Sequence, residues 1–280
     1  MRHFPASLDL QGRTVFVVGR GKPALHEVRL LLDAGARVSL VAPTVGARPG
    51  SAERAKALHR LESEALLETA IRRVFPGRIA LVSSFGAESA VLLDMVARVD
   101  PTTPVIFLNT GKLFGETLRY RDSLVEILGL TDVREIRPHA EAIAEEDRDG
   151  ILWEERPDRC CFLRKVLPLE RALRGFDAWI SGRKRFHGGE RGALPVVDLV
   201  DGRFKIEPLA QWSKQDLEDY FATAPHLPRH PLEGDGFLSI GCMPCTSRVA
   251  PGEGVRDGRW RHLDKTECGI HQPAAMRRSA

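Results

Sequence analysis

The chain has 280 residues, which is enough for one large domain or for one domain with an appendage. Its composition is 43% hydrophobic and 28% charged, close to the globular average, which excludes wholesale disorder, collagen-like repeats and a disulfide-stapled miniprotein. The formal net charge of +3 is too small to predict nucleic acid or an anionic membrane as a partner. No apolar run is long enough to span a bilayer, and the first residues lack the apolar core of a signal peptide. We therefore expect a cytoplasmic protein.

The first 45 residues carry a β-rich run, a glycine turn, an amphipathic helix pattern and a second β-rich run, which predict one βαβ unit. Gly19, Gly21 and Ala24 fit the turn that approaches a phosphate in dinucleotide-binding folds. This stretch resembles the start of the NAD-binding domain of siroheme synthases. Because one βαβ unit cannot form the crevice between two halves of a sheet, we favour a structural or vestigial, partial Rossmann-like segment over a nucleotide site.

Residues 46–60 are predicted as a linker and the start of a helix, and strand and helix patterns alternate after them. The strands are predicted at residues 79–83, 105–108, 133–136, 178–181 and 204–207, and the helices at residues 52–75, 90–99, 116–128, 162–173 and 214–221. This alternation predicts an α/β fold with a mostly parallel sheet and helices on both faces. After Pro225 the chain is rich in Pro, Gly and His, so we expect irregular structure there.

Two polar turns follow neighbouring predicted strands. The first spans residues 83–89 and begins with Ser83, Ser84, Phe85 and Gly86. Because it ends a strand and opens a helix, its N–H groups and hydroxyls face the place where an anion would bind. It lacks the Gly-Lys-Ser/Thr ending of a Walker A motif, and a serine N-cap is the structural alternative. The second turn includes Thr110 and Gly111. Two such turns at one sheet edge favour a nucleotide pocket.

Four cysteines form two close pairs, Cys160 with Cys161 and Cys242 with Cys245. Four thiolates are enough for a tetrahedral zinc site or for a [4Fe–4S] cluster, and buried small apolar residues are the alternative. Adjacent helical residues project about 100° apart, so Cys160 and Cys161 fit the separate iron corners of a cubane better than one small ion. Zinc stays open at this point.

The fifth cysteine, Cys268, lies in a polar segment with Lys265 and His271 nearby. This setting favours an exposed thiolate nucleophile, although Glu267 would oppose ionisation and a free surface cysteine is the alternative. Basic residues crowd this half of the chain. They are Arg183, Lys184, Arg185, Arg191, Arg248, Arg256 and Arg259. Together they favour a site that binds phosphate or sulfate over a charged face that only contacts solvent.

From near Leu61 to His271 the sequence resembles the assimilatory adenylyl-sulfate (APS) and phosphoadenylyl-sulfate (PAPS) reductases. The motifs that carry the resemblance are SSFGAESAVLL, NTGKLFGETLRYRD, RCCFLRKVLPLERAL, PLAQWSKQDL, SIGCMPCT and KTECGIH. The resemblance implies an adenine-nucleotide α-hydrolase-like fold, similar to the ATP pyrophosphatases. It also implies a nucleotide-binding reductase domain at residues 61–235 and a mobile catalytic segment with the CxxC at residues 236–280.

The same resemblance implies a set of roles. Cys268 would attack the sulfate sulfur, release AMP and form an S-sulfocysteine, from which thioredoxin or a glutaredoxin-like dithiol would release sulfite. Cys160, Cys161, Cys242 and Cys245 would bind a [4Fe–4S] cluster, a feature of members that generally use APS. The implied substrate-binding residues are Ser83, Ser84, Phe85, Gly86, Thr110, Gly111, Lys165, Gly182, Arg183, Arg191, Arg256 and Arg259. We expect the segment with Cys268 to close over the substrate and then to face the dithiol.

Three other functions are weighed against an APS reductase. A PAPS reductase would share the mechanism, and an ATP pyrophosphatase-like enzyme would adenylate its substrate. The third alternative, a non-catalytic metal-binding or redox-sensing protein, assigns no function to Cys268. Asn109 departs from the resemblance, because an Asp is common at that position in the family. The N-terminal segment suggests a link to sulfite reduction, which needs siroheme. A homo-oligomer is left open.

Overall fold

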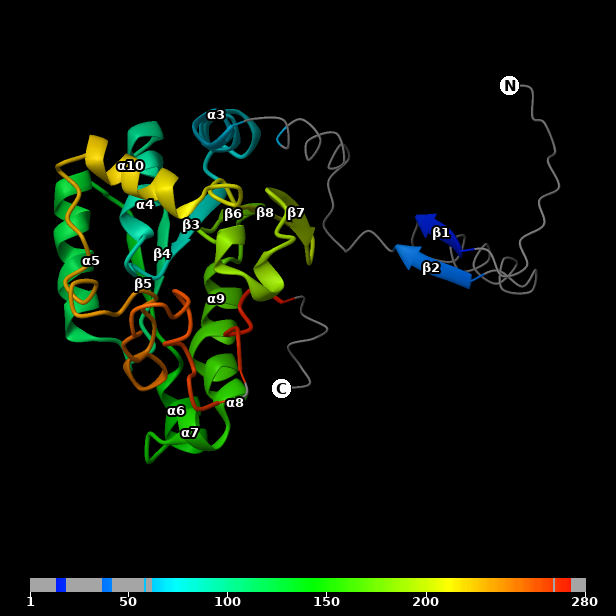
Figure 1. Ribbon diagram of the computed structural model, residues 1–280. Coiled ribbons are helices and arrows are strands. Elements are labelled where there is room, and N and C mark those ends of the chain that lie inside the picture. The colour runs from blue at the N-terminus through cyan, green and yellow to red at the C-terminus, as the bar shows by residue number, and fades with distance from the viewer. Residues whose placement is uncertain (1–13, 19–36, 42–57, 59–61, 264, 273–280) are drawn as a thin grey trace, which may run out of the picture. The chain divides into compact units, whose positions relative to one another are not determined.

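The computed structural model describes residues 14–18, 37–41, 58, 62–263 and 265–272 (Figure 1). The chain divides into two compact units, Met1–Ser51 and Ala52–Ala280. In the first, β1 (Thr14–Val18) and β2 (Arg37–Val41) pair in parallel, as the βαβ pattern predicts. The predicted glycine turn, with Gly19, Gly21 and Ala24, and nearly all of the linker at residues 46–60 lie outside the described residues.

The second unit is built on a six-stranded sheet in the order β5-β4-β3-β6-β8-β7. The strands are β3 (Ile79–Ser83), β4 (Val105–Leu108), β5 (Val133–Ile136), β6 (Ala178–Ile180), β7 (Val197–Val200) and β8 (Arg203–Ile206). Neighbours pair in parallel except β7 and β8, which form a hairpin. The chain runs outward from β3 to β5 and then returns to β6 on the other side of β3. A topological switch point therefore lies between β3 and β6, where ligands bind in open α/β sheets.

Helices cover both faces of the sheet (Figure 1). One face carries α3 (Ser63–Glu68), the π-helical turn η1 (Thr69–Val74), α4 (Ser89–Val99), α5 (Gly115–Leu128) and α10 (Lys214–Thr223). The chain from β5 to β6 carries α6 (Ala140–Glu146), α7 (Leu152–Glu155), α8 (Pro157–Cys161), the π-helical turn η2 (Phe162–Val166) and α9 (Leu167–Ala172). The expected α/β class with a mostly parallel sheet is confirmed.

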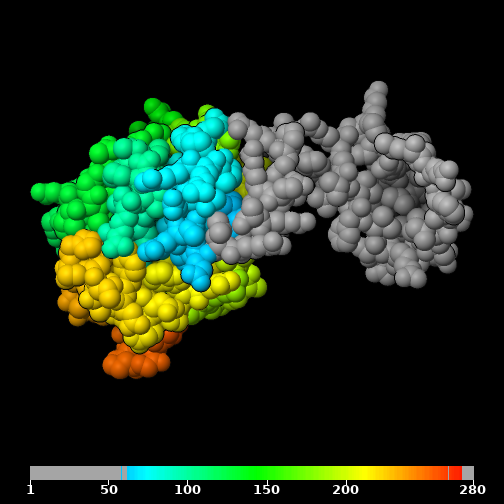
Figure 2. All heavy atoms as spheres, turned by 90° about the horizontal axis from the view of Figure 1, so that it is seen from above, coloured from blue at the N-terminus to red at the C-terminus, as the bar shows by residue number. Residues whose placement is uncertain are grey.

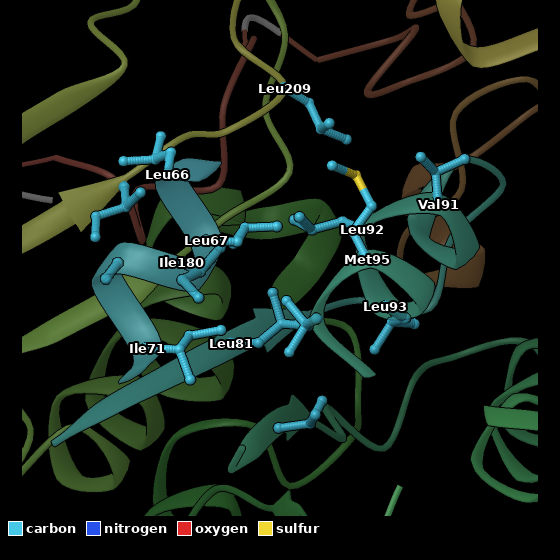
Figure 3. Close-up of a cluster of buried hydrophobic side chains, with 14 of the residues drawn as sticks. Leu66, Leu67, Ile71, Leu81, Val91, Leu92, Leu93, Met95, Ile180 and Leu209 are labelled. Carbon is cyan, nitrogen blue, oxygen red and sulfur yellow. The ribbon is translucent and has the colours of Figure 1, made fainter. Parts of the chain in front are cut away.

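Strand side chains alternate between two hydrophobic clusters, as the period of two in a strand requires. In β3, Ile79 and Leu81 pack into the cluster under α4, whereas Ala80 packs with Leu169 of α9. The first cluster is the larger one, and Figure 3 shows its leucines and Met95 meeting between α3, α4 and the sheet. Both faces of the sheet are therefore buried, which explains the almost uninterrupted apolar runs of the central strands.

Local signals fix several helix ends. Ser213 caps α10 by accepting from the backbone N–H of Asp216, whose carboxylate accepts in return from the Ser213 N–H, and Gly129 ends α5 at φ 61°. Ahead of α10, Trp212 Nε1 donates to Ser63 Oγ at 2.8 Å, which holds α3 beside this segment (Figure 2). After α10 the described chain contains one further short helix, the 3-10 turn η5 (Met243–Cys245), in agreement with the expected irregular tail.

None of the described helices combines the length and apolar character needed to cross a membrane.

Candidate active site

A pocket of about 220 Å³ opens at the carboxyl ends of β3, β4 and β6, on the switch point of the sheet. Most of the predicted substrate and nucleophile positions line it: Ser83, Ser84, Gly86, Thr110, Lys165, Gly182, Arg183, Arg191, Arg256, Arg259 and Cys268. Among the described residues, Phe85 and Gly111 do not line this pocket. Segments that are far apart in sequence therefore meet in one cavity.

The turn after β3 is held in a fixed shape by its own side chains. Phe85 adopts the left-handed backbone region at φ 49°, and its ring is fully buried 5.3 Å from the ring of Phe107. Its N–H donates to Ser83 Oγ at 3.2 Å. A Cβ on Gly86 would lie 3.2 Å from the carbonyl oxygen of Ile240, so the turn packs directly on the segment before the CxxC. The side chain of Phe85 therefore packs in the hydrophobic core, and only its backbone lies near the pocket.

The turn after β4 joins the pocket to the cysteines. Asn109 Oδ1 accepts from the N–H of Gly111 at 3.0 Å, which closes an Asx turn of the kind that an Asp would also form. Thr110 Oγ1 lies 3.2 Å from Cys242 Sγ, and the carbonyl of Thr110 accepts from Arg164 Nη1 at 2.7 Å. The departure at Asn109 therefore keeps the turn and removes one negative charge from its edge.

The four paired cysteines surround a second, smaller cavity. Cys160 and Cys161 end α8, Cys242 precedes η5 and Cys245 ends it, and all four line this cavity. Burial raises the pKa of Cys160 to about 11 and that of Cys161 to about 12. Burial acts in the same direction on Cys242, but the Lys165 ammonium and the Thr110 hydroxyl outweigh it and lower that pKa. Within the described residues, no group of three or more His, Cys, Asp or Glu side chains is placed to hold a metal ion.

Lys165 lies between the two cavities and lines both. It belongs to η2, the π-helical turn that continues α8, and such turns often occur at functional sites. Burial would lower its pKa, but electrostatic interactions with the sulfurs of Cys242, Cys268 and Cys161 outweigh burial and hold it above the usual range. Lys165 therefore keeps its positive charge beside the nucleophile position and beside the paired cysteines.

Two arginines from the C-terminal segment complete the cationic wall. The Arg259 guanidinium stacks 4.4 Å from the ring of Trp260, and its Nε is buried without a hydrogen-bond partner among the described residues. Burial and the nearby Arg191 lower the pKa of Arg256 to about 10, so Arg256 is still charged at neutral pH. His271 Nδ1, which also lines the pocket, is a second buried atom without a partner in the described chain.

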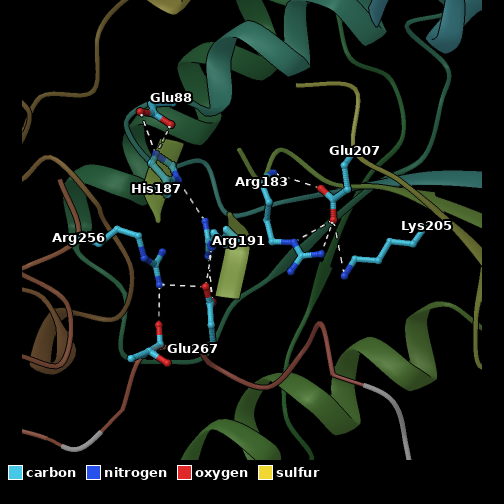
Figure 4. A network of polar contacts seen from close by, with 9 residues as sticks. Glu88, Arg183, His187, Arg191, Lys205, Glu207, Arg256 and Glu267 are labelled. Carbon is cyan, nitrogen blue, oxygen red and sulfur yellow. Dashed lines mark hydrogen bonds and ion pairs between the residues drawn. The ribbon is translucent and has the colours of Figure 1, made fainter. Parts of the chain in front are cut away.

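A network of ion pairs runs along one side of the pocket (Figure 4). Arg191 donates to both carboxylate oxygens of Glu267, at 2.5 Å and 3.0 Å, and Arg256 lies 3.3 Å from the same carboxylate. Burial would raise the pKa of Glu267, but its hydrogen bonds with Arg191 and the charge of Arg256 lower it. Glu267 is therefore ionised and neutralised by cations. No local sequence pattern indicated the pairing of Glu267 with Arg191 and Arg256.

The other basic residues of the network also have acceptors. Arg183 Nε donates to Glu207 at 2.9 Å, and Lys184 Nζ donates to Glu88 at 2.6 Å. Sequence reasoning singled out the cations and missed these carboxylates, because no local spacing links residue 207 to residue 183 or residue 88 to residue 184. Only the position of Glu88 in the turn after a strand marked it as a pocket residue.

Residues 78–248 match the phosphoadenosine phosphosulfate reductase domain, and residues 6–95 match a putative NAD(P)-binding family. The chain belongs to the phosphoadenosine phosphosulfate reductase family. It is 52% identical over 206 residues to an adenosine 5'-phosphosulfate reductase of Mesorhizobium japonicum, covering 74% of this chain and 81% of that protein. It is 42% identical over 185 residues to one of Mycobacterium tuberculosis, covering 65% and 72% of the two chains.

A solved structure shares the fold. The crystal structure of phosphoadenylyl-sulfate reductase from Candida auris in a phosphate complex superposes with a TM-score of 0.60 at 27% identity. The similarity covers 73% of this chain and all of that one. The family resemblance is thereby confirmed. The NAD(P)-binding match extends to residue 95, well beyond the 45 residues expected, and overlaps the reductase match from residue 78.

Proposed function

We propose that the chain is an APS reductase that converts adenylyl sulfate to sulfite and AMP with electrons from thioredoxin or a similar dithiol. The observation that carries the proposal is that Cys268 lines the same pocket as the strand-end turns and Arg259. The relatives at 52% and 42% identity bear this name. Of the four buried side-chain atoms without partners among the described residues, two, Arg259 Nε and His271 Nδ1, belong to residues that line this pocket, as expected of groups that await a ligand.

The pocket supports binding of the nucleotide across the switch point. The turn after β3 supplies Ser83, Ser84 and backbone N–H groups for the anionic end, and Gly182 lines the pocket after β6. Lys165 and Arg259 supply positive charge on the side where Cys268 lies. Sulfate is a poor and negatively charged electrophile, so attack by a thiolate needs this charge.

The reaction that we propose balances with one dithiol. The Cys268 thiolate attacks the sulfate sulfur, an S–S bond forms, and the bond from sulfur to the bridging oxygen breaks with AMP as leaving group. A thiolate of the dithiol then attacks the Cys268 sulfur, and sulfite leaves with the electron pair of the broken bond. The second thiol of the dithiol resolves the mixed disulfide. The dithiol loses two electrons and two protons, and sulfur gains the electrons.

We propose that Cys160, Cys161, Cys242 and Cys245 bind a [4Fe–4S] cluster. Four thiols around one cavity form the donor set of such a cluster, and Thr110 and Lys165 provide polar contacts to Cys242. When bound, the cluster would hold α8 and η5 together and add to the electrostatic field near the sulfate. The dithiol supplies both electrons, so no step needs electrons from the cluster.

The pairing of the basic residues favours APS over PAPS. A 3′-phosphate would need free cations, whereas Arg183 is paired with Glu207, Lys184 with Glu88, and Arg191 with Glu267. Each pair would have to open before its cation could bind a second phosphate.

The test is sulfite release by anaerobically purified protein with reduced thioredoxin and matched concentrations of APS and PAPS. Strong preference for APS is expected. Preference for PAPS would keep the mechanism and overturn the substrate assignment. Absence of sulfite from both, in protein that retains iron, would overturn the reductase proposal, and ATP turnover in the same preparation would then favour an adenylating enzyme.

A further inference from the structure

The residue immediately before the nucleophile anchors its segment to the rest of the second unit. Glu267 is a pocket-wall residue whose side chain is 11% exposed, and its two oxygens accept from Arg191 at 2.5 Å and 3.0 Å. Arg256 Nη2 lies 3.3 Å from the same carboxylate and also donates to the carbonyl of Thr266 at 2.7 Å. Glu267 is joined to Cys268 by one peptide bond, so these contacts restrain the backbone next to the thiol.

Arg191 is itself fixed from the opposite side. It ends the short 3-10 turn η4 (Gly189–Arg191), and its Nη1 lies 3.2 Å from His187 Nδ1. His187 contacts Glu88, the residue before α4, in the turn after β3. A chain of polar contacts therefore runs from the nucleotide-binding turn to the nucleophile segment, and Figure 4 shows it as one continuous row.

The remaining anchors of residues 265–272 lie on other elements. Lys265 pairs with Asp158 of α8, and His271 stacks on Trp179 of β6 with ring centroids 5.4 Å apart. Ile270 packs on the apolar cluster beneath α9. These contacts hold the ends of the segment, whereas the pair of Glu267 with Arg191 holds the residue next to the thiol.

We propose that Glu267 is a positioning residue, and that its bidentate pair with Arg191 holds Cys268 in the pocket until the segment turns outward to the dithiol. The proposal rests on the proposed function, because it assigns the two positions of Cys268 that the two attacks require. The paired state presents the thiol to the bound sulfate. The open state, with the carboxylate hydrated and Arg191 released, presents the S-sulfocysteine to the reductant.

The first test follows the segment without any turnover. Holoenzyme is treated with iodoacetamide, and alkylation of the Cys268 peptide is followed by mass spectrometry over a range of pH. Glu267→Gln is expected to raise the plateau rate of alkylation at high pH by about tenfold, because a weakened ion pair opens more often. The matched control is Glu190→Gln, which changes an exposed carboxylate next to Arg191. If the alkylation rate at high pH equalled that of the wild type, the proposal would be overturned. This holds even if the midpoint of the rate against pH shifted.

A double-mutant cycle assigns the effect to the pair. Arg191→Gln and Glu267→Gln, each made singly, are expected to raise the high-pH alkylation rate of Cys268 to a similar extent. The double variant is expected to exceed either single variant by little. Additive effects would show that the two side chains act separately and would contradict the proposal.

The second test separates positioning from binding. In a single turnover with APS and no reductant, Glu267→Gln is expected to release AMP about tenfold more slowly than the wild type, with the same affinity for AMP in calorimetry. Equal losses of affinity and rate would make Glu267 a binding residue instead. If the wild type released no AMP, the proposed function would fail while the alkylation result would still stand.

Discussion

The guanidinium of Arg259 lies directly on the backbone of Gly241, and a Cβ at Gly241 would meet it before any other group. Gly241 directly precedes Cys242, the first cysteine of the CxxC. The position of the Arg259 guanidinium therefore requires a residue without a side chain at this point. Since the obstructed atoms are the end of a flexible side chain, Gly241→Ala is expected to displace Arg259 with little effect on folding.

We therefore expect Gly241→Ala to lower kcat/KM for APS by about tenfold or more, with a melting temperature close to that of the wild type. The control is Gly234→Ala, where a Cβ would meet nothing within 4 Å. Steady-state sulfite release and thermal unfolding measure the two quantities. Full activity of Gly241→Ala would show that the displaced guanidinium has no part in the reaction.

Cys268→Ser is expected to abolish both sulfite release and the S-sulfo adduct, because a hydroxyl neither attacks sulfate sulfur nor forms a bond that a thiol can cleave. Its iron content is expected to equal that of the wild type. Mass spectrometry of protein incubated with APS detects the adduct. Residual sulfite at more than about a thousandth of the wild-type rate would assign the nucleophile to another thiol.

Cys161→Ser is expected to lose most of its iron and the visible absorption of a cluster, because it removes one of four thiolates. Colorimetric iron and sulfide assays after anaerobic purification measure this loss, with Cys268→Ser as the matched control. Four irons per chain in Cys161→Ser would exclude that residue as a ligand. One equivalent of zinc in the wild type, without sulfide, would replace the cluster by a zinc site.

Glu88 predicts how stability depends on pH. Burial would raise its pKa, but hydrogen bonds and charges from His187 and Lys184 lower it to about 2. A carboxylate with a lowered pKa stabilises the fold at neutral pH, and this contribution is lost as pH falls from the unfolded pKa of about 4.5 toward 2. The contribution is at most about 3 kcal/mol.

Glu88→Gln is therefore expected to lose less stability than the wild type between pH 5 and pH 3, on the order of 1 to 2 kcal/mol less by urea unfolding. Glu145→Gln, at an exposed position of α6, is the control and should follow the wild-type curve. Parallel curves for Glu88→Gln and the wild type would mean that the pairs with Lys184 and His187 do not favour the ionised form.

Removal of residues 1–45 is expected to leave sulfite release unchanged, because every residue that lines the main pocket lies between Leu81 and His271. The rate per active site and the melting temperature of the truncated protein measure the effect, with the full chain as reference. A clear loss of rate at equal stability would give the N-terminal unit a part in the reaction.

Much of the second unit was predictable from its sequence. The strands β3, β4 and β5 have the expected bounds. The first two are short apolar runs bounded by turn residues, whereas β5 (VREI) has apolar residues only at its two ends. The strand β7 was missed because it is a half-exposed edge strand, and α6 was missed because none of its residues is buried. Without a buried face there is no periodicity for sequence reasoning to detect.

The site divides in the same way. The motifs placed Cys268 and the four paired cysteines as candidate site residues, and the family resemblance added Lys165; the structure brings all six to the two cavities. The carboxylates that neutralise the arginines were missed, since Glu207 and Arg183 meet only when β8 lies next to β6. Phe85 was expected at the substrate, and its ring lies in the core because the left-handed backbone of this residue turns it inward.

Lys165 touches both cavities, so the holoprotein proposed above would contain its own reporter of occupancy. An anion that enters the pocket would draw on the same ammonium that faces the paired cysteines, and the electronic spectrum of a cluster there would respond. Candidate inhibitors could then be ranked by a colour or resonance change in the protein, without substrate, reductant or any label.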